Sequence, residues 1–256
     1  VTFVQLLTHT SSIVEDEYTG GYADLYVKGD SPVKLGDFLT DYLVPSGAYY
    51  DRKNNFKKRC PGTVASYSNV GVGLLGYLVE VVSGTPFEIF CRGHIYTPLG
   101  MNEVSWRLSE LDLEHVAMPY SGNQSSGFKP VGHFGFPTFP DGLLRTSAPQ
   151  LARFLLMFMQ FGELGGTRIL SRESVRKMRR VYFPDLDDEQ GLIWYYNSFG
   201  SLKRVIGHDG SDPGTSSMMY FDPKDGVGVL LVANGNWKWG RAKALVKKIF
   251  MEANRY

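Results

Sequence analysis

The chain has 256 residues, of which 43% are hydrophobic and 21% are charged, and its formal net charge is +1. Such a chain is globular and can bury a sizeable core, and its charge gives no electrostatic reason to expect nucleic acid or an anionic membrane as a partner. The longest dense apolar run, residues 154–161, is too short for a membrane span, which needs ~20 residues. Cys60 and Cys91 are too few for a disulfide framework, and the sequence leaves open whether they pair.

The first two thirds of the chain predict helices separated by loops. Residues 3–7 have the pattern of the last turns of a helix whose beginning is missing, and residues 44–66 lack periodicity and indicate a loop. Residues 105–145 are rich in Gly, Pro and Phe, which is typical of a long segment that shapes a binding cleft. Further helices are expected at 34–42, at 69–82 before a stop at Ser83-Gly84, at 86–96 with Pro86 in the first turn, at 147–161 with Ser147 as a cap, and at 172–180.

After Pro184 the pattern changes from helices to strands. Strands are expected at 193–196, 203–206, 216–221 and 227–233, and residues 222–226 form a hairpin turn between the last two. Residues 239–254 predict an amphipathic closing helix. Helices followed by an antiparallel meander and a final helix indicate an α+β fold.

The first candidate motif is Tyr67-Ser68-Asn69, which stands between a loop and a predicted helix. In that place the phenol of Tyr67 and the amide of Asn69 can both point into a cleft. A phenol has an ordinary pKa of about 10 and becomes a useful base only when neighbouring cations favour the phenolate. The same tripeptide also fits a buried tyrosine followed by an asparagine that caps a helix.

The second candidate motif is His208-Asp209-Gly210-Ser211, which follows the strand-like pair Val205-Ile206. A glycine at the end of a strand lets a substrate carbonyl approach the backbone closely, and the amide of Ser211 can then donate to a developing oxyanion. Gly210 and Asp209 are therefore the candidate substrate-binding residues. The alternative is an ordinary strand-to-loop turn with an exposed histidine.

Two other patterns carry no such chemistry. Residues 71–76 match G-x-G-x-x-G, but no strand precedes or follows them, so close helix packing explains the glycines better than a dinucleotide site. The remaining histidines have no metal-ligand spacing, and they are His9, His94, His115 and His133. We expect neither a metal nor an organic cofactor.

Together the two motifs resemble those of the serine β-lactamase and penicillin-binding-protein family, in particular its class C β-lactamase-related branch, which includes esterases and D-aminopeptidases. Tyr67-x-Asn69 and His208-x-Gly210 correspond to two of the family's three motifs. Further segments resemble family members in the expected order along nearly the whole chain, and they are 6–11 (LLTHTS), 140–147 (PDGLLRTS), 221–223 (FDP) and 234–235 (NG).

The resemblance implies one incomplete β-lactamase-like domain over residues 1–256. Residues of about 13–180 would form a helical lobe with the cleft loops, and residues 181–256 an antiparallel sheet flanked by helices. The family's N-terminal strands and the helix that bears its nucleophile are expected to be missing, which would uncover one sheet edge. A complementing N-terminal segment or a homo-oligomer would then be needed.

The chain also departs from the family pattern. Ser12 stands where members usually have glycine, and His208 replaces the lysine of many β-lactamases. The third motif, Ser-x-x-Lys with the nucleophile, is expected upstream of Val1. Matches to Ser-x-x-Lys do occur downstream of the LLTHTS segment, but chance explains them and none is expected to be the nucleophile; they lie at 31–34, 126–129 and 174–177.

The chemistry that the resemblance implies is acyl transfer through a serine acyl-enzyme. Tyr67 would be the general base and later the acid, and Asn69 would hold the substrate amide or orient the lysine. His208 would face the cleft and tune Tyr67, and the amide of Ser211 would be half of the oxyanion hole. The substrate would be a small molecule or peptide, namely a β-lactam, a D-amino peptide or a simple ester.

Two alternatives remain open. A catalytically inactive member would keep the cleft for a binding or structural role, and an interaction module would use the aromatic residues 134–139. The 256-residue chain alone is expected to be inactive, because the nucleophile would lie outside it.

Overall fold

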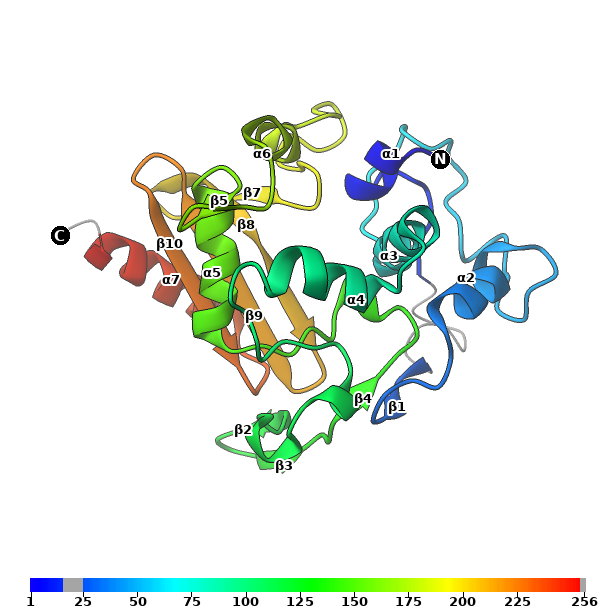
Figure 1. Ribbon diagram of the computed structural model, residues 1–256, viewed down its shortest axis with the longest axis horizontal. Coiled ribbons are helices and arrows are strands. Elements are labelled where there is room, and N and C mark those ends of the chain that lie inside the picture. Colours follow the sequence, from blue (N-terminus) through cyan, green and yellow to red (C-terminus); the bar gives the residue numbers. More distant parts are fainter. Residues whose placement is uncertain (16–24, 254–256) are drawn as a thin grey trace.

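A computed structural model of the protein describes residues 1–15 and 25–253. An antiparallel sheet with helices on both faces makes one part of the molecule, and helices around α3 (Asn69–Ser83) make the other (Figure 1). The order of helices, then antiparallel strands, then a closing helix confirms the predicted α+β class. The expected boundary between two lobes near residue 180 remains a prediction.

The main sheet has the strand order β10-β9-β8-β7 and is antiparallel throughout. Its strands are β7 (Tyr195–Phe199), β8 (Leu202–Asp212), β9 (Thr215–Asp222) and β10 (Val227–Ala233). Pro213 and Gly214 close the β8–β9 hairpin and set Asp212 opposite Thr215, with Gly214 at a φ of 72° that favours glycine. This short turn fixes the register of the strand that carries His208 to Ser211.

Alternate residues of the sheet pack against helices on its two faces, as the two-residue repeat of a strand requires. One face packs on α7 (Trp239–Ala253), and its cluster includes Val205, Met218, Tyr220, Val229, Ala242, Val246 and Phe250. The other face packs on α5 (Ala148–Met159) and α6 (Arg172–Arg179), and its cluster includes Leu155, Phe158, Val175, Trp194, Ile206 and Phe221. Helices therefore cover both faces of the sheet.

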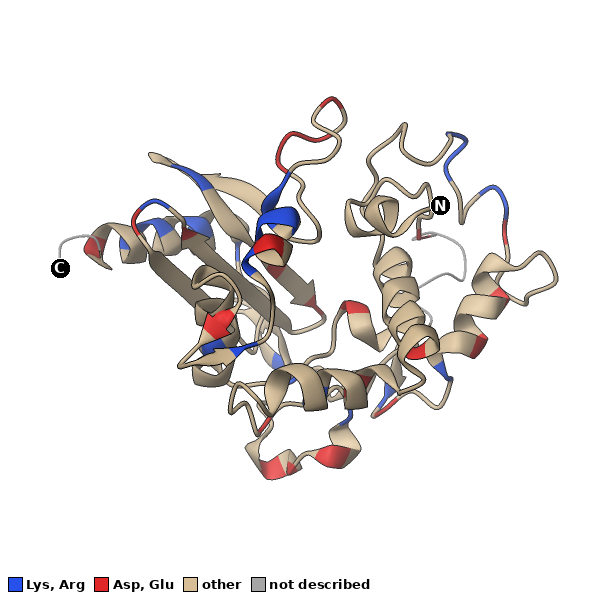
Figure 2. Cartoon of the chain, turned by 45° about the horizontal axis from the view of Figure 1, so that its top comes forward, with Lys and Arg blue, Asp and Glu red and all other residues tan. Residues whose placement is uncertain are grey.

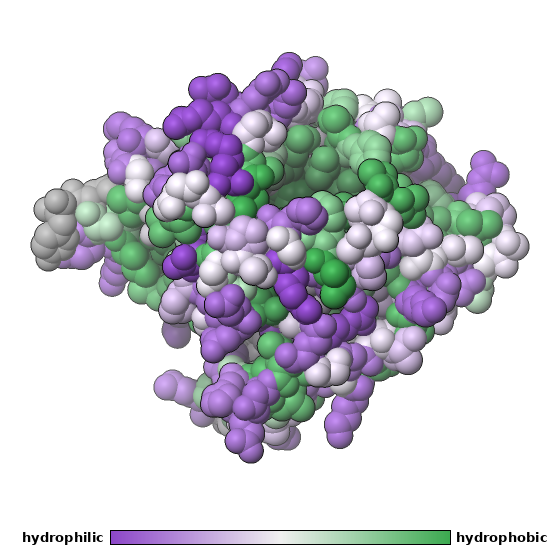
Figure 3. Space-filling view, viewed as in Figure 1, coloured by the Kyte–Doolittle hydropathy of each residue, from purple (hydrophilic) through white to green (hydrophobic). Residues whose placement is uncertain are grey.

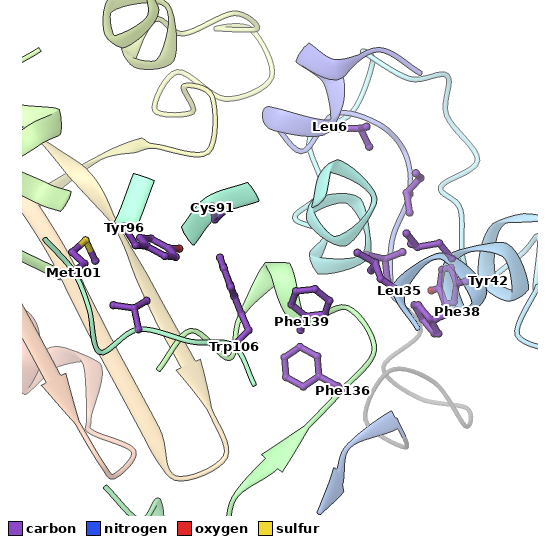
Figure 4. Packing of buried hydrophobic residues seen from close by; sticks show 14 of the residues in the cluster. Leu6, Leu35, Phe38, Tyr42, Cys91, Tyr96, Met101, Trp106, Phe136 and Phe139 are labelled. Carbon is purple, nitrogen blue, oxygen red and sulfur yellow. The ribbon is translucent and has the colours of Figure 1, made fainter. Parts of the chain in front are cut away.

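Around α3 lie α1 (Phe3–Leu7), α2 (Leu35–Leu43) and α4 (Phe87–Cys91), which continues as a π-helical turn, Arg92–Tyr96. Side chains from these helices meet loop residues in a second core (Figure 4), which includes Leu35, Phe38, Tyr42, Trp106, Phe136 and Phe139. The loop that carries the last two aromatic residues also forms one wall of the cleft described below.

Glycines in α3 allow that loop to approach the helix closely. A Cβ atom on Gly76 would lie 2.5 Å from Cγ of Pro140, and one on Gly73 would lie 3.0 Å from Thr138. Pro140 belongs to the 3₁₀ turn Phe139–Asp141. Helix packing, as predicted, explains the G-x-G-x-x-G match.

Short elements complete the fold. Three two-stranded sheets pair β1 (Val27–Lys28) with β4 (Phe134–Gly135), β2 (Tyr120–Asn123) with β3 (Gly127–Pro130), and β5 (Glu163–Leu164) with β6 (Thr167–Arg168). Among the described residues, Leu108–Glu110 and Leu113–His115 also form 3₁₀ turns. The segment 105–145 is mostly irregular, as expected, but the sequence did not predict its strands.

Several expectations about element ends were wrong. Helix α1 is not the remainder of a longer helix, because Thr2 caps it by a reciprocal capping box with Gln5. Ser147 does stand at the N-cap position of α5, as expected, but its side chain makes no capping hydrogen bond. Strand β8 continues through Asp212 instead of ending at Ile206, because β9 pairs with it up to the Pro213-Gly214 turn.

Other expectations can be compared directly with the structure. Cys60 is exposed and Cys91 is buried, and both are free thiols, so they do not pair. Helix α7 agrees with the expected closing helix, although Asn254 lies outside the described residues. In the part of the chain that the structure describes, no single helix has the length and hydropathy of a membrane span. Helix α3 and the helix Phe87–Tyr96 reach that length and hydropathy only together, and they are bent by 78° relative to each other.

Candidate active site

A large cleft lies between the sheet and the helical part of the molecule, with a volume of about 1890 Å³. Its lining includes Tyr67, Asn69, His208 and Ser211. The surface is hollowed between the part that carries α6 and the part that carries α1, and hydrophobic residues border the hollow (Figure 3). Two motifs that lie about 140 residues apart in the sequence thus face one cavity.

Tyr67 and Asn69 lie at the point where a loop enters α3. The side chain of Ser68 caps this helix by accepting from the amide of Gly71 at 2.9 Å. The Tyr67 hydroxyl donates to Oδ1 of Asn69 at 3.0 Å. The helix cap therefore fixes the residue between them and turns both functional side chains toward the cleft.

His9 supports the same loop from the side of α1. Its ring centroid lies 4.4 Å from that of Tyr67, its Nδ1 accepts from the amide of Ser68 at 3.3 Å, and its carbonyl accepts from the amide of Ser66. Burial and, to a smaller extent, the charge of His208 lower the pKa of His9 to about 4, so the ring is neutral and carries its proton on Nε2, because Nδ1 is the acceptor. Among the described residues Nε2 has no hydrogen-bond partner.

Glu15 forms a contact that the sequence did not predict. Its carboxylate accepts from the amides of Asn69 and Val70 and from the side-chain amide of Asn69, which places it at the N-terminus of α3. A helix N-terminus favours a negative charge. No local pattern links Glu15 to a helix that begins 54 residues later, so only the folded chain reveals this contact.

The environment of Tyr67 is acidic. Burial between the cleft walls raises the pKa of Tyr67, and the carboxylates of Asp141, Glu15, Asp209 and Asp212 raise it further. The side chain is still 55% exposed, because it faces the open cleft. The described residues therefore supply charges opposite in sign to the cations that a phenolate base needs.

The residues His208 to Ser211 lie in β8 next to an unpaired strand edge. Asp212 and Thr215 close a two-residue hairpin, so the backbone N–H and C=O groups of every second residue of β8 are directed at β9. Those of Asp209 and Ser211 point the other way, away from β9. On that side the pairing with β7 ends at Gly207. The amide of Ser211 is thus directed toward the cleft edge.

The His208 and Asp209 side chains lie on opposite faces of β8. Nδ1 of His208 contacts the carbonyl of Asp209, and burial lowers the pKa of His208. The Asp209 carboxylate accepts from the Tyr220 hydroxyl at 3.0 Å, and Tyr220 also contacts the Tyr195 hydroxyl. The expected substrate-binding residue Asp209 therefore lines the cleft with a carboxylate that two neighbouring strands hold in place.

Gly210, the other expected substrate-binding residue, has a steric reason to be glycine. A Cβ atom there would lie 2.9 Å from the Oγ of Ser217 on the adjacent strand. The absence of a side chain also leaves the cleft side of β8 open near Ser211.

Asn236 holds the end of the β8–β9 hairpin and was not predicted. Its side-chain amide donates to the carbonyls of Asp212 and Thr215 and to the hydroxyl of Ser211, and its Oδ1 accepts from the amide of Gly214. One side chain thus stabilises the turn next to the Ser211 amide. On the other side of the turn, the Tyr26 hydroxyl donates to Asp212 at 2.8 Å.

The three Ser-x-x-Lys matches lie away from the cleft. Residues 31–34 precede α2, residues 126–129 lie on the exposed β2–β3 hairpin, and Lys177 of α6 pairs with Glu173. None of their serines or lysines is among the described residues that line the cavity. Nor do the described residues contain a group of three or more His, Cys, Asp or Glu side chains that could hold a metal ion.

The Beta-lactamase family matches residues 1–246 of this chain. Penicillin-binding protein 4 of Amycolatopsis lactamdurans is 28% identical over 271 residues that cover 98% of this chain and 63% of that protein. The chain spans less than two thirds of the length of the curated relatives it matches.

Solved structures of the same fold extend the comparison. D-amino acid amidase from Ochrobactrum anthropi, complexed with L-phenylalanine, has a TM-score of 0.76 at 20% identity and is matched over 100% of this chain and 72% of its own. A class C β-lactamase in complex with cefoxitin has a TM-score of 0.73 at 20% identity, with coverages of 98% and 71%. With a cleft formed by the Tyr-x-Asn loop and the His-x-Gly strand, and a family match over nearly its whole length, this chain belongs to the Beta-lactamase family of serine β-lactamases and penicillin-binding proteins.

Proposed function

We propose that this chain contributes most of the active site of a serine hydrolase that forms an acyl-enzyme on an amide or ester. The supporting observation is that the Tyr67-x-Asn69 loop and the β8 edge at Ser211 line one cleft. In this proposal Tyr67 moves the proton, Asn69 holds the substrate amide or orients a lysine, and the amide of Ser211 donates to the oxyanion. His208 would face the cleft and tune Tyr67.

The nucleophile in this proposal comes from a Ser-x-x-Lys segment outside these 256 residues. The acidic surroundings of Tyr67 support that assignment, because a lysine ammonium beside the phenol would offset the carboxylates that raise its pKa. The only Lys or Arg side chain among the described lining residues is Arg145. Without such a segment, the described lining residues offer Tyr67 no lysine to make it a base.

Two features of the fold leave room for a complementing segment. Ligand pockets have volumes of roughly 300–1,000 Å³, whereas this cleft measures about 1890 Å³. Strand β10 is the outer strand of the main sheet, and Val232 on it is 48% exposed. A helix in the cleft and a strand along β10 would cover apolar surface and unpaired backbone groups.

A fluorophosphonate probe, which labels activated serines, tests the proposal. The 256-residue chain and the same chain extended by the coding sequence that precedes Val1 are treated with the probe, and mass spectrometry locates the label. We expect label only on the extended protein, on a serine before Val1. Label on neither protein would contradict the hydrolase and favour a catalytically inactive binding protein.

A matched pair of variants of the extended protein tests the role of Tyr67. Tyr67→Phe removes the proposed base and should slow labelling by about 10²-fold or more. Tyr49→Phe removes a comparable hydroxyl from an exposed residue outside the cleft lining and should label at the original rate. Equal rates for the two variants would exclude Tyr67 as the base.

A further inference from the structure

Glu15 connects the segment after α1 to the first turn of α3, and it lines the cleft. The residue before it is held in place, because the amide of Val14 donates to the Asn55 carbonyl at 3.0 Å and its carbonyl accepts from the Tyr42 hydroxyl at 2.7 Å. Helices α1 and α3, which are described in full, contain no Lys or Arg residue, whereas many basic residues lie on α6 and α7 (Figure 2). The amide groups at the start of α3, and not a cation from either helix, therefore place the Glu15 carboxylate.

The two oxygens of the Glu15 carboxylate have different partners. Oε1 accepts from the backbone amides of Asn69 and Val70, the latter at 3.0 Å, and a helix N-terminus favours such a negative charge. Oε2 accepts from the side-chain Nδ2 of Asn69 at 3.2 Å. Glu15 therefore stabilises the end of the helix and also holds the side chain of one residue of the Tyr67-x-Asn69 motif.

The contact with Oε2 determines which way the Asn69 amide is turned. An ionised carboxylate only accepts hydrogen bonds, so the NH2 group of Asn69, and not its oxygen, faces Glu15. The amide oxygen Oδ1 then lies on the other side, where it accepts from the Tyr67 hydroxyl at 3.0 Å. The orientation of Asn69 thus follows from the charge of Glu15.

Asn69 in turn sets the hydrogen-bonding role of Tyr67. A neutral phenol has one O–H, and Tyr67 donates it to Oδ1. A Tyr67 phenolate would face the lone pairs of Oδ1 with no hydrogen between the two oxygens. To donate to a phenolate, Asn69 would have to turn its NH2 group toward Tyr67 and so place Oδ1 against the Glu15 carboxylate. Glu15 therefore opposes the charged form of Tyr67 by way of Asn69.

We propose that Glu15 is a positioning residue of the candidate active site, which holds Asn69 with its oxygen toward Tyr67 and so keeps the Tyr67 hydroxyl a hydrogen-bond donor. The consequence for catalysis rests on the proposed function, whereas the hydrogen bonds are a property of the chain itself. In that function a protonated Tyr67 is ready to give its proton to a leaving group, and turning the Asn69 amide would favour the phenolate that acts as a base.

The substitution Glu15→Gln separates the helix cap from the orientation of Asn69. Glutamine keeps one oxygen that can accept from the two backbone amides, but an NH2 group replaces the oxygen that accepts from Asn69. A donor at that position favours the opposite orientation of Asn69, with Oδ1 toward residue 15 and NH2 toward Tyr67. The cap should therefore remain, while the hydrogen bond between Asn69 and Tyr67 reverses.

The test measures the pKa of the phenol at position 67 in the 256-residue chain. Tyr67 is replaced by 3,5-difluorotyrosine, because the phenol of this residue is more acidic than that of tyrosine and titrates before strong alkali unfolds the protein. Fluorine NMR follows the titration. We expect Glu15→Gln to lower this pKa by about 1–2 pH units, the size expected for a hydrogen bond to a charged group.

Asp141→Asn is the matched control for the charge of Glu15. Burial raises the pKa of Tyr67 most, and four carboxylates raise it further; in order of decreasing effect they are Asp141, Glu15, Asp209 and Asp212. The His9 ring also lies against Tyr67, but it is neutral. If Glu15 acted by its charge alone, Asp141→Asn would lower the pKa at least as much as Glu15→Gln. We expect a smaller fall for Asp141→Asn, and an equal or larger one would overturn the proposal.

A double-mutant cycle provides a second measurement. In an Asn69→Ala background the amide that carries the effect is missing, so Glu15→Gln should lower the pKa of the phenol no more than Asp141→Asn does. A fall as large as in the presence of Asn69 would overturn the proposal, and so would the absence of any fall when Asn69 is present.

The proposed function and this inference fail in different ways. If the fluorophosphonate probe labels the extended protein but Glu15→Gln and Asp141→Asn lower the pKa equally, only the inference fails. If the pKa of the phenol changes as expected but no serine is labelled, the acyl-enzyme fails, and Glu15 positions Tyr67 in a binding site.

Discussion

Replacing Gly76 with alanine tests how closely α3 and the cleft loop approach each other. In an exposed helix interior this change would stabilise the protein by up to about 1 kcal/mol, because alanine has the higher helix propensity. Here the new Cβ would lie 2.5 Å from Cγ and 2.6 Å from Cβ of Pro140, whose ring cannot move aside as a flexible side chain would. Overpacking of this kind costs about 1–3 kcal/mol. We expect a net loss of about 1–2 kcal/mol.

Gly240→Ala is the matched control. Gly240 lies in α7, and a Cβ atom there would meet no heavy atom within 4 Å, so this variant should gain up to about 1 kcal/mol. Urea unfolding followed by circular dichroism gives both free energies of unfolding. If Gly76→Ala is as stable as Gly240→Ala, Pro140 does not lie as close to α3 as described. The position of the cleft wall that Pro140 belongs to would then also be incorrect.

Three further predictions concern the residues around the cleft. Ser12 has a φ of 66°, and its hydroxyl donates to the Arg59 carbonyl. Both Ser12→Gly and Ser12→Ala lose that hydrogen bond, but only glycine adopts this backbone without strain. Thermal unfolding should therefore show the glycine variant to be more stable than the alanine variant by about 1 kcal/mol. The pKa of His9 is about 4 in the folded chain against an ordinary 6.5, so the unfolded chain binds the proton more readily. The free energy of unfolding, measured by urea titration, should therefore fall by up to about 3 kcal/mol as the pH falls from 6.5 to 4. The His9→Asn variant should not show this fall. Asn236→Ala should cost about 1 kcal/mol and speed amide hydrogen exchange of residues 211–215, and unchanged exchange there would contradict its role in the hairpin.

The helices were predictable where the sequence itself ends them. Gly84 ends α3 because it adopts a left-handed backbone with a φ of 67°, and the apolar spacing of α2 is local as well. The end of β8 was not predictable in the same way. His208 to Asp212 is a polar run without alternation, and only pairing with β9 makes it a strand. Strand β7 begins at Tyr195 and not at Ile193, because Ile193 has a left-handed backbone with a φ of 65°. The strand propensity of isoleucine does not predict this conformation.

The site residues also differ in whether a local sequence pattern could reveal them. Tyr67, Asn69 and the residues near Ser211 could be proposed because each belongs to a short motif with its own chemistry. Glu15 and Asn236 could not, since each acts on a segment far away in the sequence, and carboxylates and amides are common on any surface. The sequence indicated only that Tyr67 needs neighbouring cations to act as a base, and the four carboxylates that surround it come together only in the folded chain.

The open edge of β8 has a consequence for the behaviour of this protein at high concentration. A strand edge with unpaired backbone groups is a template on which a second copy can add its own strand, and this is a common route to aggregation. Two copies that paired antiparallel along residues 208–212 would bring Asp209 and Asp212 of one near those of the other, and facing like charges destabilise such a ladder. Asp209 and Asp212 would therefore oppose strand addition by a second copy at this edge, and the edge would stay accessible to a ligand.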